Sequence, residues 1–183
     1  MKNFLAEYNN DLINALHSLN ADQLEGIAEV IMKARSDGKV VYLLGNGGSS
    51  ATPSHSAGDW SKELGIKAIC LTDNTPSVTA FANDTEYSNI FRGQLETFLE
   101  VGDIVMGYSG SGNSPNVINA ISFAKEKGNV TIGISGDYKN GKGGKLAILA
   151  DLSVVANTSS MERIEDIHMI INHILKEYIR IKI

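Results

Sequence analysis

Cysteine and long hydrophobic runs are scarce in this 183-residue sequence, and each scarcity excludes a class of protein. Cys70 is the one cysteine, so the chain can form no internal disulfide and no CxxC metal or redox motif. Its apolar neighbours favour a small buried side chain. No run approaches about 18 apolar residues, and the first residues, MKNFLAEYNN, lack the apolar stretch of a secretion signal. We therefore expect an untargeted cytoplasmic protein that does not enter a membrane.

Positive charge is also in short supply. Sixteen Lys and Arg residues face 21 Asp and Glu residues, which gives a net charge of −5. Because the whole chain repels polyanions, nucleic acid and anionic membranes are poor candidate partners. Apolar residues make up 43% of the sequence, which is typical of a globular protein. No repeat or low-complexity linker divides it, so we expect one domain over residues 1–183.

Short apolar runs alternate with helix-like stretches through the middle of the chain. The predicted strands are 40–44, 68–71, 104–108, 130–134 and 152–155. The predicted helices between them are 50–64, 76–82, 86–99, 115–127 and 142–149. This alternation predicts an α/β fold with a doubly wound parallel sheet and right-handed crossovers. A ligand should then bind at the carboxyl ends of the strands.

Helical patterns also stand at both ends of the sequence, over 3–18, 21–35 and about 160–180. Ser159-Ser160-Met161-Glu162 predicts a capping box at the start of the last helix. The apolar surface of this helix is wider than one face. We therefore expect the sheet and a second subunit to cover it, which predicts a homo-oligomer.

Two serine-glycine loops follow predicted strands. The first occupies residues 45–50 and the second residues 109–115, where Ser114 suits the N-cap of a helix and Pro115 its first position. Small residues at a helix N-terminus leave backbone N–H groups free for an anion, and serine hydroxyls add further donors. A monophosphate held by neutral donors is the ligand that this pattern favours.

A nucleotide is the alternative ligand. The first loop reads G-x-G-x-x-S, close to the dinucleotide fingerprint, and Asp73 could serve as its acidic residue. Neither loop contains the Gly-Lys-Ser/Thr of a P-loop. We expect no nucleotide cofactor.

Three separated motifs, GNGGSSATPSH, SGSGNSPNVINAI and RIEDIHMIINHIL, resemble the sugar isomerase (SIS) family, and most closely its phosphoheptose isomerases. The resemblance implies a five-stranded parallel sheet between helices, a homotetramer with sites at subunit interfaces, and a phosphorylated sugar as substrate. Gly110 stands where the family usually has Thr. Matching the motifs position by position implies these substrate-binding residues: Asn46, Gly47, Gly48, Ser49, Asn83, Asp84, Ser109, Gly110, Ser111, Ser114 and Glu165.

Histidines and carboxylates suggest a metal and acid–base cluster. His55 and Asp59 are four residues apart, which places both on one face of a helix. In the resembled family, a divalent metal, often zinc, is held at the positions of His55, Asp59, Glu165 and His173. Asp59 replaces the usual Glu, and Glu165 replaces the usual Gln.

The residue of the last helix that joins His173 as a metal ligand has two candidates. At about 100° per residue, Asp166 points closer to the direction of His173 than Glu165 does, so Asp166 is an alternative. We expect His17 at the surface and His168 in a packing or interface role.

The resemblance implies an aldose–ketose isomerase that acts on sedoheptulose 7-phosphate or a close relative, and the histidine–carboxylate cluster suits the proton transfers of an enediol mechanism. Asp59 would be the base and His173 the acid. The alternative is a non-catalytic phosphosugar-binding regulator or a replication-initiator-associating protein, because the resembled family includes both. The hypothesis of a nicotinamide-dependent enzyme is supported only by the G-x-G-x-x-S pattern of the first loop.

Overall fold

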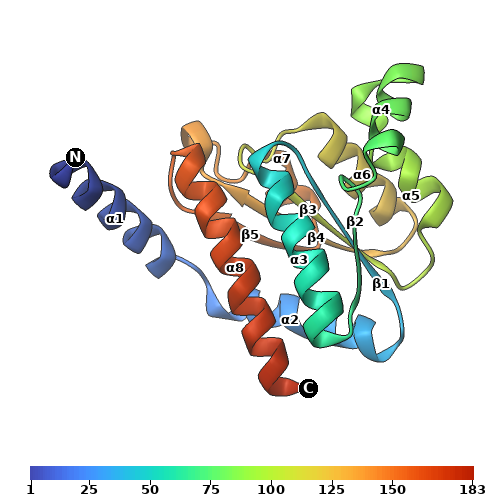
Figure 1. Cartoon of the computed structure of the whole chain (residues 1–183), viewed down its shortest axis with the longest axis horizontal. Coiled ribbons are helices and arrows are strands. Elements are labelled where there is room, and N and C mark those ends of the chain that lie inside the picture. Colours follow the sequence, from blue (N-terminus) through green and yellow to red (C-terminus); the bar gives the residue numbers. More distant parts are fainter.

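The five predicted strands form one parallel sheet in the computed structural model, which describes residues 1–183 (Figure 1). The strands are β1 (Val40–Gly45), β2 (Lys67–Cys70), β3 (Ile104–Ser109), β4 (Val130–Gly136) and β5 (Leu152–Ala156). Their spatial order is β2-β1-β3-β4-β5, so the winding direction changes between β1 and β3. A crevice for ligands opens at such a switch point in doubly wound sheets. The predicted α/β class is confirmed.

Helices cover both faces of the sheet. The α-helices are α1 (Lys2–His17), α2 (Ala21–Ser36), α3 (Gly48–Leu64), α4 (Thr75–Asp84), α5 (Arg92–Phe98), α6 (Pro115–Glu126), α7 (Gly144–Leu149) and α8 (Met161–Lys182). One apolar cluster joins α2, α3 and α8 to the sheet, and a second joins α5, α6 and α7 to its other face. Figure 1 shows α3 and α8 running side by side, and they make the most extensive helix–helix contact.

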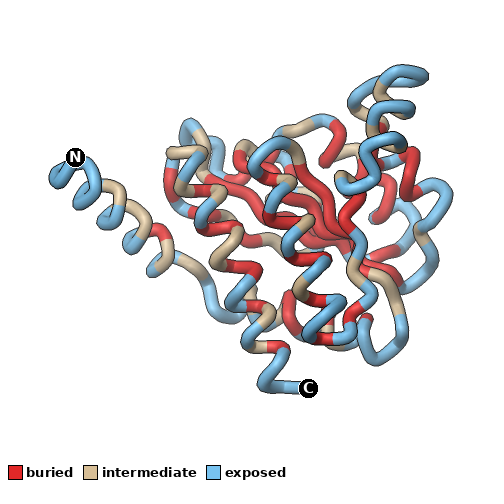
Figure 2. Tube along the Cα trace, in the orientation of Figure 1, coloured by how far each residue is buried: buried red, intermediate tan, exposed pale blue.

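Each central strand divides its side chains between the two clusters. In β1, Val41 and Leu43 join the cluster under α3 and α8, whereas Tyr42 and Leu44 join the opposite one. The sheet is therefore buried on both faces, as the red trace in Figure 2 shows. Each fully buried Leu or Ile contributes roughly 1.5–3 kcal/mol, so this double burial fixes the strand register firmly.

Two local predictions are wrong. The predicted helix 86–99 is divided into a 3₁₀ turn (Tyr87–Asn89) and α5, because adjacent Ile90 and Phe91 are both buried at the junction and packing sets the path of the chain. The predicted capping box at 159–162 does not form either. Ser160 is the N-cap, its hydroxyl donates to Glu162 Oε2 at 2.8 Å, and its side chain caps no backbone N–H.

The first helix forms as predicted but projects from the body of the molecule (Figure 1). Its side chains contact α8 through Tyr8 with Asp166 and through Asp11 with Arg163. Phe4, Leu5 and Ile13 are exposed on this helix. Their apolar surface is thus unused within one chain. None of the helices is long and apolar enough to span a lipid bilayer.

Candidate functional site

The first serine-glycine loop turns the chain sharply from β1 into α3. Gly47 has φ 54° and ψ −128°, a conformation that suits glycine, and it occupies the N-cap of α3 without a capping side chain. The first N–H groups of α3 are therefore left for other acceptors. Beside this turn, the amides of Asn46 and Asn116 donate to each other at 2.8 and 2.7 Å, and Tyr87 Oη donates to Asn46 Oδ1 at 3.1 Å.

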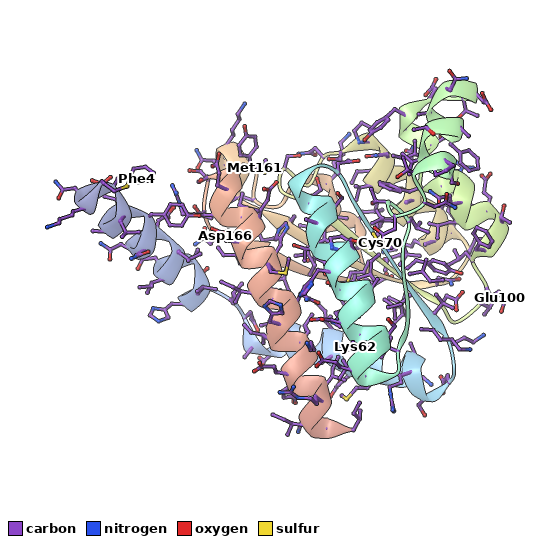
Figure 3. The ribbon with its side chains drawn as sticks, in the orientation of Figure 1. Phe4, Lys62, Cys70, Glu100, Met161 and Asp166 are labelled. Carbon is purple, nitrogen blue, oxygen red and sulfur yellow. The ribbon has the colours of Figure 1, made fainter.

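The second serine-glycine loop leaves β3, the neighbour of β1. Ser114 is the N-cap of α6 and Pro115 its first residue, as predicted, but the Ser114 hydroxyl pairs with Ser109 Oγ at 3.0 Å instead of capping the helix. At Gly110, a Cβ atom would overlap Met161 Sδ, at the start of α8 (Figure 3). Met161 thus fills the space that a side chain would need at this position.

Together the two loops line a cavity of about 250 Å³ at the carboxyl edge of β1 and β3. Its lining residues are Asn46, Gly47, Gly48, Ser49, Tyr108, Ser109, Gly110, Ser111, Ser114, Met161 and Glu165. Asn83 and Asp84 lie apart from this lining, exposed at the end of α4, where Asn83 Nδ2 donates to Asp84 Oδ1 at 2.8 Å. The structure brings the other predicted substrate-binding residues together.

Glu165 is the one charged residue of the cavity lining. Its carboxylate lies over Gly48, where a Cβ atom would overlap both oxygens. Burial, together with nearby Glu162 and Asp166, raises the pKa of Glu165. Gly48 therefore leaves the room that this carboxylate occupies.

A cluster of two imidazoles and one carboxylate links α3 to α8. His55 Nε2 lies 3.1 Å from His173 Nε2 and 3.2 Å from Asp59 Oδ2. The structure thus joins residues 118 positions apart. Neither candidate for the remaining ligand belongs to this cluster. Glu165 faces Gly48, and Asp166 accepts a hydrogen bond from Tyr8 on the side of α8 near α1 (Figure 3).

Lys176 ties the same two helices together, one turn after His173. Its Nζ lies 2.9 Å from Asp59 Oδ2 and 3.0 Å from Glu63 Oε1. Hydrogen bonding to Lys176 lowers the pKa of Asp59, and the charge of His55 acts in the same direction. Asp59 is therefore held as a carboxylate.

The cluster suits a divalent metal ion. Its three ligand atoms lie within 4.8 Å of one another. With bonds of about 2.0–2.1 Å, tetrahedral zinc places its nitrogen and oxygen ligands about 3.3 Å apart. The distances from His55 Nε2 to His173 Nε2 and to Asp59 Oδ2, 3.1 and 3.2 Å, are close to this value. Imidazole and carboxylate ligands suit zinc and also other divalent ions.

The other two histidines lie where the sequence predicts. His17 is exposed, and His168 is fully buried with Nε2 3.2 Å from Ser135 O. Burial lowers the pKa of His168 to about 4, so the ring is neutral. Cys70 is buried, which confirms its packing role.

Four site residues were missed by the sequence analysis: Tyr108, Asn116, Met161 and Lys176. Asn116 lies within the motif SGSGNSPNVINAI, so the resemblance could have identified it as a site residue. Asp59 and Glu63 are four residues apart on one face of α3, which indicates an acidic face, but the sequence does not identify Lys176 as its partner. Nothing local pointed to Met161.

A model of the SIS domain family matches residues 4–136. The chain belongs to the SIS domain family. This SIS chain is 35% identical to the phosphoheptose isomerase of Clostridium acetobutylicum, across 96% of this chain and 92% of that protein. It is 33% identical to the phosphoheptose isomerase of Aliarcobacter butzleri, across 98% and 94% of the two chains.

The fold of the SIS chain also matches a solved relative. The structure of phosphoheptose isomerase from Neisseria gonorrhoeae superimposes with a TM-score of 0.89 at 27% identity, covering 97% of this chain and 95% of that one. The similarity therefore includes the terminal helices as well as the sheet.

Proposed function

We propose that this protein is an aldose–ketose isomerase that converts sedoheptulose 7-phosphate into a heptose 7-phosphate. The observation that carries the proposal is the His55–Asp59–His173 cluster, formed on α3 and α8 of a chain whose serine-glycine loops line one cavity. The relatives named phosphoheptose isomerase support this substrate class. We assign residues 1–183 to a single domain of this kind.

The cavity supplies neutral donors for the phosphate. Ser109, Ser111 and Ser114 offer hydroxyls, and the start of α3 offers backbone N–H groups without a side-chain cap. Asn46 is held in place by Asn116, so its amide is fixed beside the ligand. Asn83 and Asp84 would contact the sugar from outside this cavity.

Isomerisation moves a proton between adjacent carbons through an enediol. Asp59 takes the proton from C1 of the ketose, and His173 gives a proton to the carbonyl oxygen at C2. In the second half, the protonated Asp59 gives its proton to C2, and the C1 hydroxyl returns a proton to His173 as the aldehyde forms at C1. Lys176 keeps Asp59 deprotonated, which is the state in which a base must begin.

A divalent metal, with zinc as the best candidate, would be held by His55, Asp59 and His173. When bound, it polarises the substrate carbonyl and stabilises enediolate charge. Glu165 is the proposed fourth ligand, and its carboxylate would have to turn from Gly48 toward the cluster.

An assay of the purified protein on five- to seven-carbon ketose phosphates, with and without chelator, tests the proposal. We expect turnover of the seven-carbon substrate without added NAD. His173→Ala and Asp59→Asn should each reduce kcat by about 10²–10⁴-fold, because each removes a proton-transfer group. His17→Ala is the matched control, since His17 is exposed outside the cluster.

Full turnover by either cluster variant would overturn the assignment of its residue. Tight binding of sugar phosphates by a wild-type protein that never isomerises them would instead favour the regulator.

A further inference from the structure

A lysine-rich loop adjoins the second serine-glycine loop. This lysine loop, residues 137–145, follows β4 and reads Asp-Tyr-Lys-Asn-Gly-Lys-Gly-Gly-Lys. Lys139, Lys142 and Lys145 are exposed, and none of them takes part in the ion pairs of the structure. Three positive charges without an ion-pair partner thus gather within seven residues of a chain whose net charge is −5, and Lys139 Nζ lies over the Tyr138 ring, 5.1 Å from its centroid.

The backbone of the lysine loop is fastened to the second serine-glycine loop. Lys145 N donates to Asn113 Oδ1 at 3.1 Å, and Leu146 N donates to Gly112 O at 2.9 Å. Gly143 O lies so close to Gly112 that a Cβ atom there would overlap it. The backbone of the lysine loop is therefore fixed against residues 112 and 113, which lie in the second serine-glycine loop between the cavity-lining Ser111 and Ser114.

The conformation of the lysine loop is unusual for its sequence. Lys139, Asn140 and Lys142 have φ of 53°, 59° and 48°, and they are the chain's three non-glycine residues with positive φ. Lys142 N donates to Asp137 Oδ1 at 2.7 Å, which helps to hold this path. Strained residues of this kind concentrate at ligand-binding segments. Two of these positive-φ positions hold lysine, although glycine adopts such a backbone conformation with less strain.

The cavity itself lacks a counter-charge for a dianion. Its lining contains no Lys, Arg or His, and its one charged side chain is the Glu165 carboxylate. Neutral donors can orient a phosphate there, but they carry no charge that would attract a dianion to an acidic chain. A cationic segment bonded to the second serine-glycine loop would supply that attraction.

We propose that the lysine loop is an electrostatic docking element for the phosphate group of the substrate. Its three ammonium groups attract the organic phosphate dianion and lower its free energy at the mouth of the cavity, while the serine-glycine loop fixes its orientation. This inference rests on the proposed function. The lysine loop contributes to substrate affinity and to the preference for phosphorylated sugars, and takes no part in proton transfer.

A triple variant, K139Q/K142Q/K145Q, tests the lysine loop. At low ionic strength, KM for sedoheptulose 7-phosphate should rise about three- to tenfold, with kcat within about twofold of wild type. The wild-type KM should increase with salt, and the triple variant should lose most of that dependence because screening acts on the removed charges. Calorimetric titration with inorganic phosphate should show the same loss of affinity.

Two matched variants control for net charge and folding. K2Q/K62Q/K127Q removes three exposed lysines elsewhere and should keep the wild-type KM and salt dependence. K139R/K142R/K145R keeps the charge and should also behave as wild type. Thermal unfolding of all three variants checks that they are folded.

Wild-type KM and salt dependence in K139Q/K142Q/K145Q would overturn the inference while leaving the isomerase proposal intact. An equal rise in KM for K2Q/K62Q/K127Q would also overturn it, because the effect would then belong to overall charge. If the wild-type protein does not isomerise the sugar phosphate, the proposed function fails. The phosphate titration then decides the role of the lysine loop by itself.

Discussion

Gly48 and Glu165 share one small space at the start of α3. The carboxylate occupies the volume that a side chain at residue 48 would need. A methyl group there displaces only the flexible end of Glu165, so the cost to folding is small. The position of the one charged group in the cavity changes nevertheless. A substitution at residue 48 should therefore change activity without a large change in the stability of the fold.

Gly48→Ala should therefore lower kcat/KM at least tenfold while changing the free energy of unfolding by less than about 1 kcal/mol. Gly58→Ala in the same helix is the control, because a Cβ atom there meets open space. It should retain activity and stabilise the fold by roughly 0.5–1 kcal/mol, since Gly is a poor helix former. Steady-state kinetics measures kcat/KM, and urea unfolding measures the free energy of unfolding, for both variants. Wild-type kcat/KM in Gly48→Ala would show that the position of the Glu165 carboxylate over Gly48 is not needed for turnover.

At the scale of elements, α8 presents two functional faces. His173 and Lys176 contact α3, whereas His168 and Asn172 are fully buried. His168 Nε2 donates to Ser135 O on β4, and its ring packs edge-on against Tyr108. Since burial lowers the pKa of His168 to about 4, the helix packs on the sheet with a neutral ring.

Acidification should consequently weaken this packing. In the unfolded chain, His168 takes up a proton near its ordinary pKa of about 6.5, well before it does so in the fold. The unfolded state thus binds more protons between about pH 6.5 and 4, and stability falls as pH falls through that range. We expect a loss of roughly 2 kcal/mol between pH 7 and 5.

Urea unfolding at both pH values, with His168→Gln as the comparison, measures this effect. The glutamine amide can still donate to Ser135 O but does not titrate. The variant should start less stable and lose less stability on acidification. An equal pH dependence in the two proteins would assign the effect to other groups.

At the scale of the whole molecule, α1 carries apolar side chains that one chain does not cover. Phe4 is 63% exposed, Leu5 55% and Ile13 49%, on a helix that projects from the body (Figures 1 and 2). Such a surface is typical of a subunit interface. It supports the proposed homotetramer.

Light scattering should accordingly give a mass of about 79 kDa, four times the 19.7 kDa of one chain. Leu5→Glu with Ile13→Glu should yield smaller species, because charge at the core of an interface is costly. Ile148→Glu, at a residue that is 87% exposed on α7, is the control and should remain tetrameric. A monomeric wild-type protein would refute the tetramer.

The sequence alone determined what depends on local pattern. Apolar runs such as 104–108 mark strands buried on both faces, and the Gly-rich turns after β1 and β3 mark the ligand-binding edge. The four-residue spacing of His55 and Asp59 places them together on α3. These features follow from backbone geometry and burial over a few residues. The resemblance to SIS motifs adds expected substrate-binding and metal-binding roles for individual residues.

Only the tertiary structure decided contacts between distant segments. It gave the contact between His173 and His55, which the sequence grouped only by resemblance, and it paired Lys176 with Asp59. It also turned Glu165 toward Gly48 and Asp166 toward Tyr8, and set Met161 beside Gly110. Each of these depends on the packing of α8 against other elements, which periodicity along one helix does not specify. A helix pattern gives the directions of side chains around its own axis. The neighbours that they meet are set by how the whole chain packs.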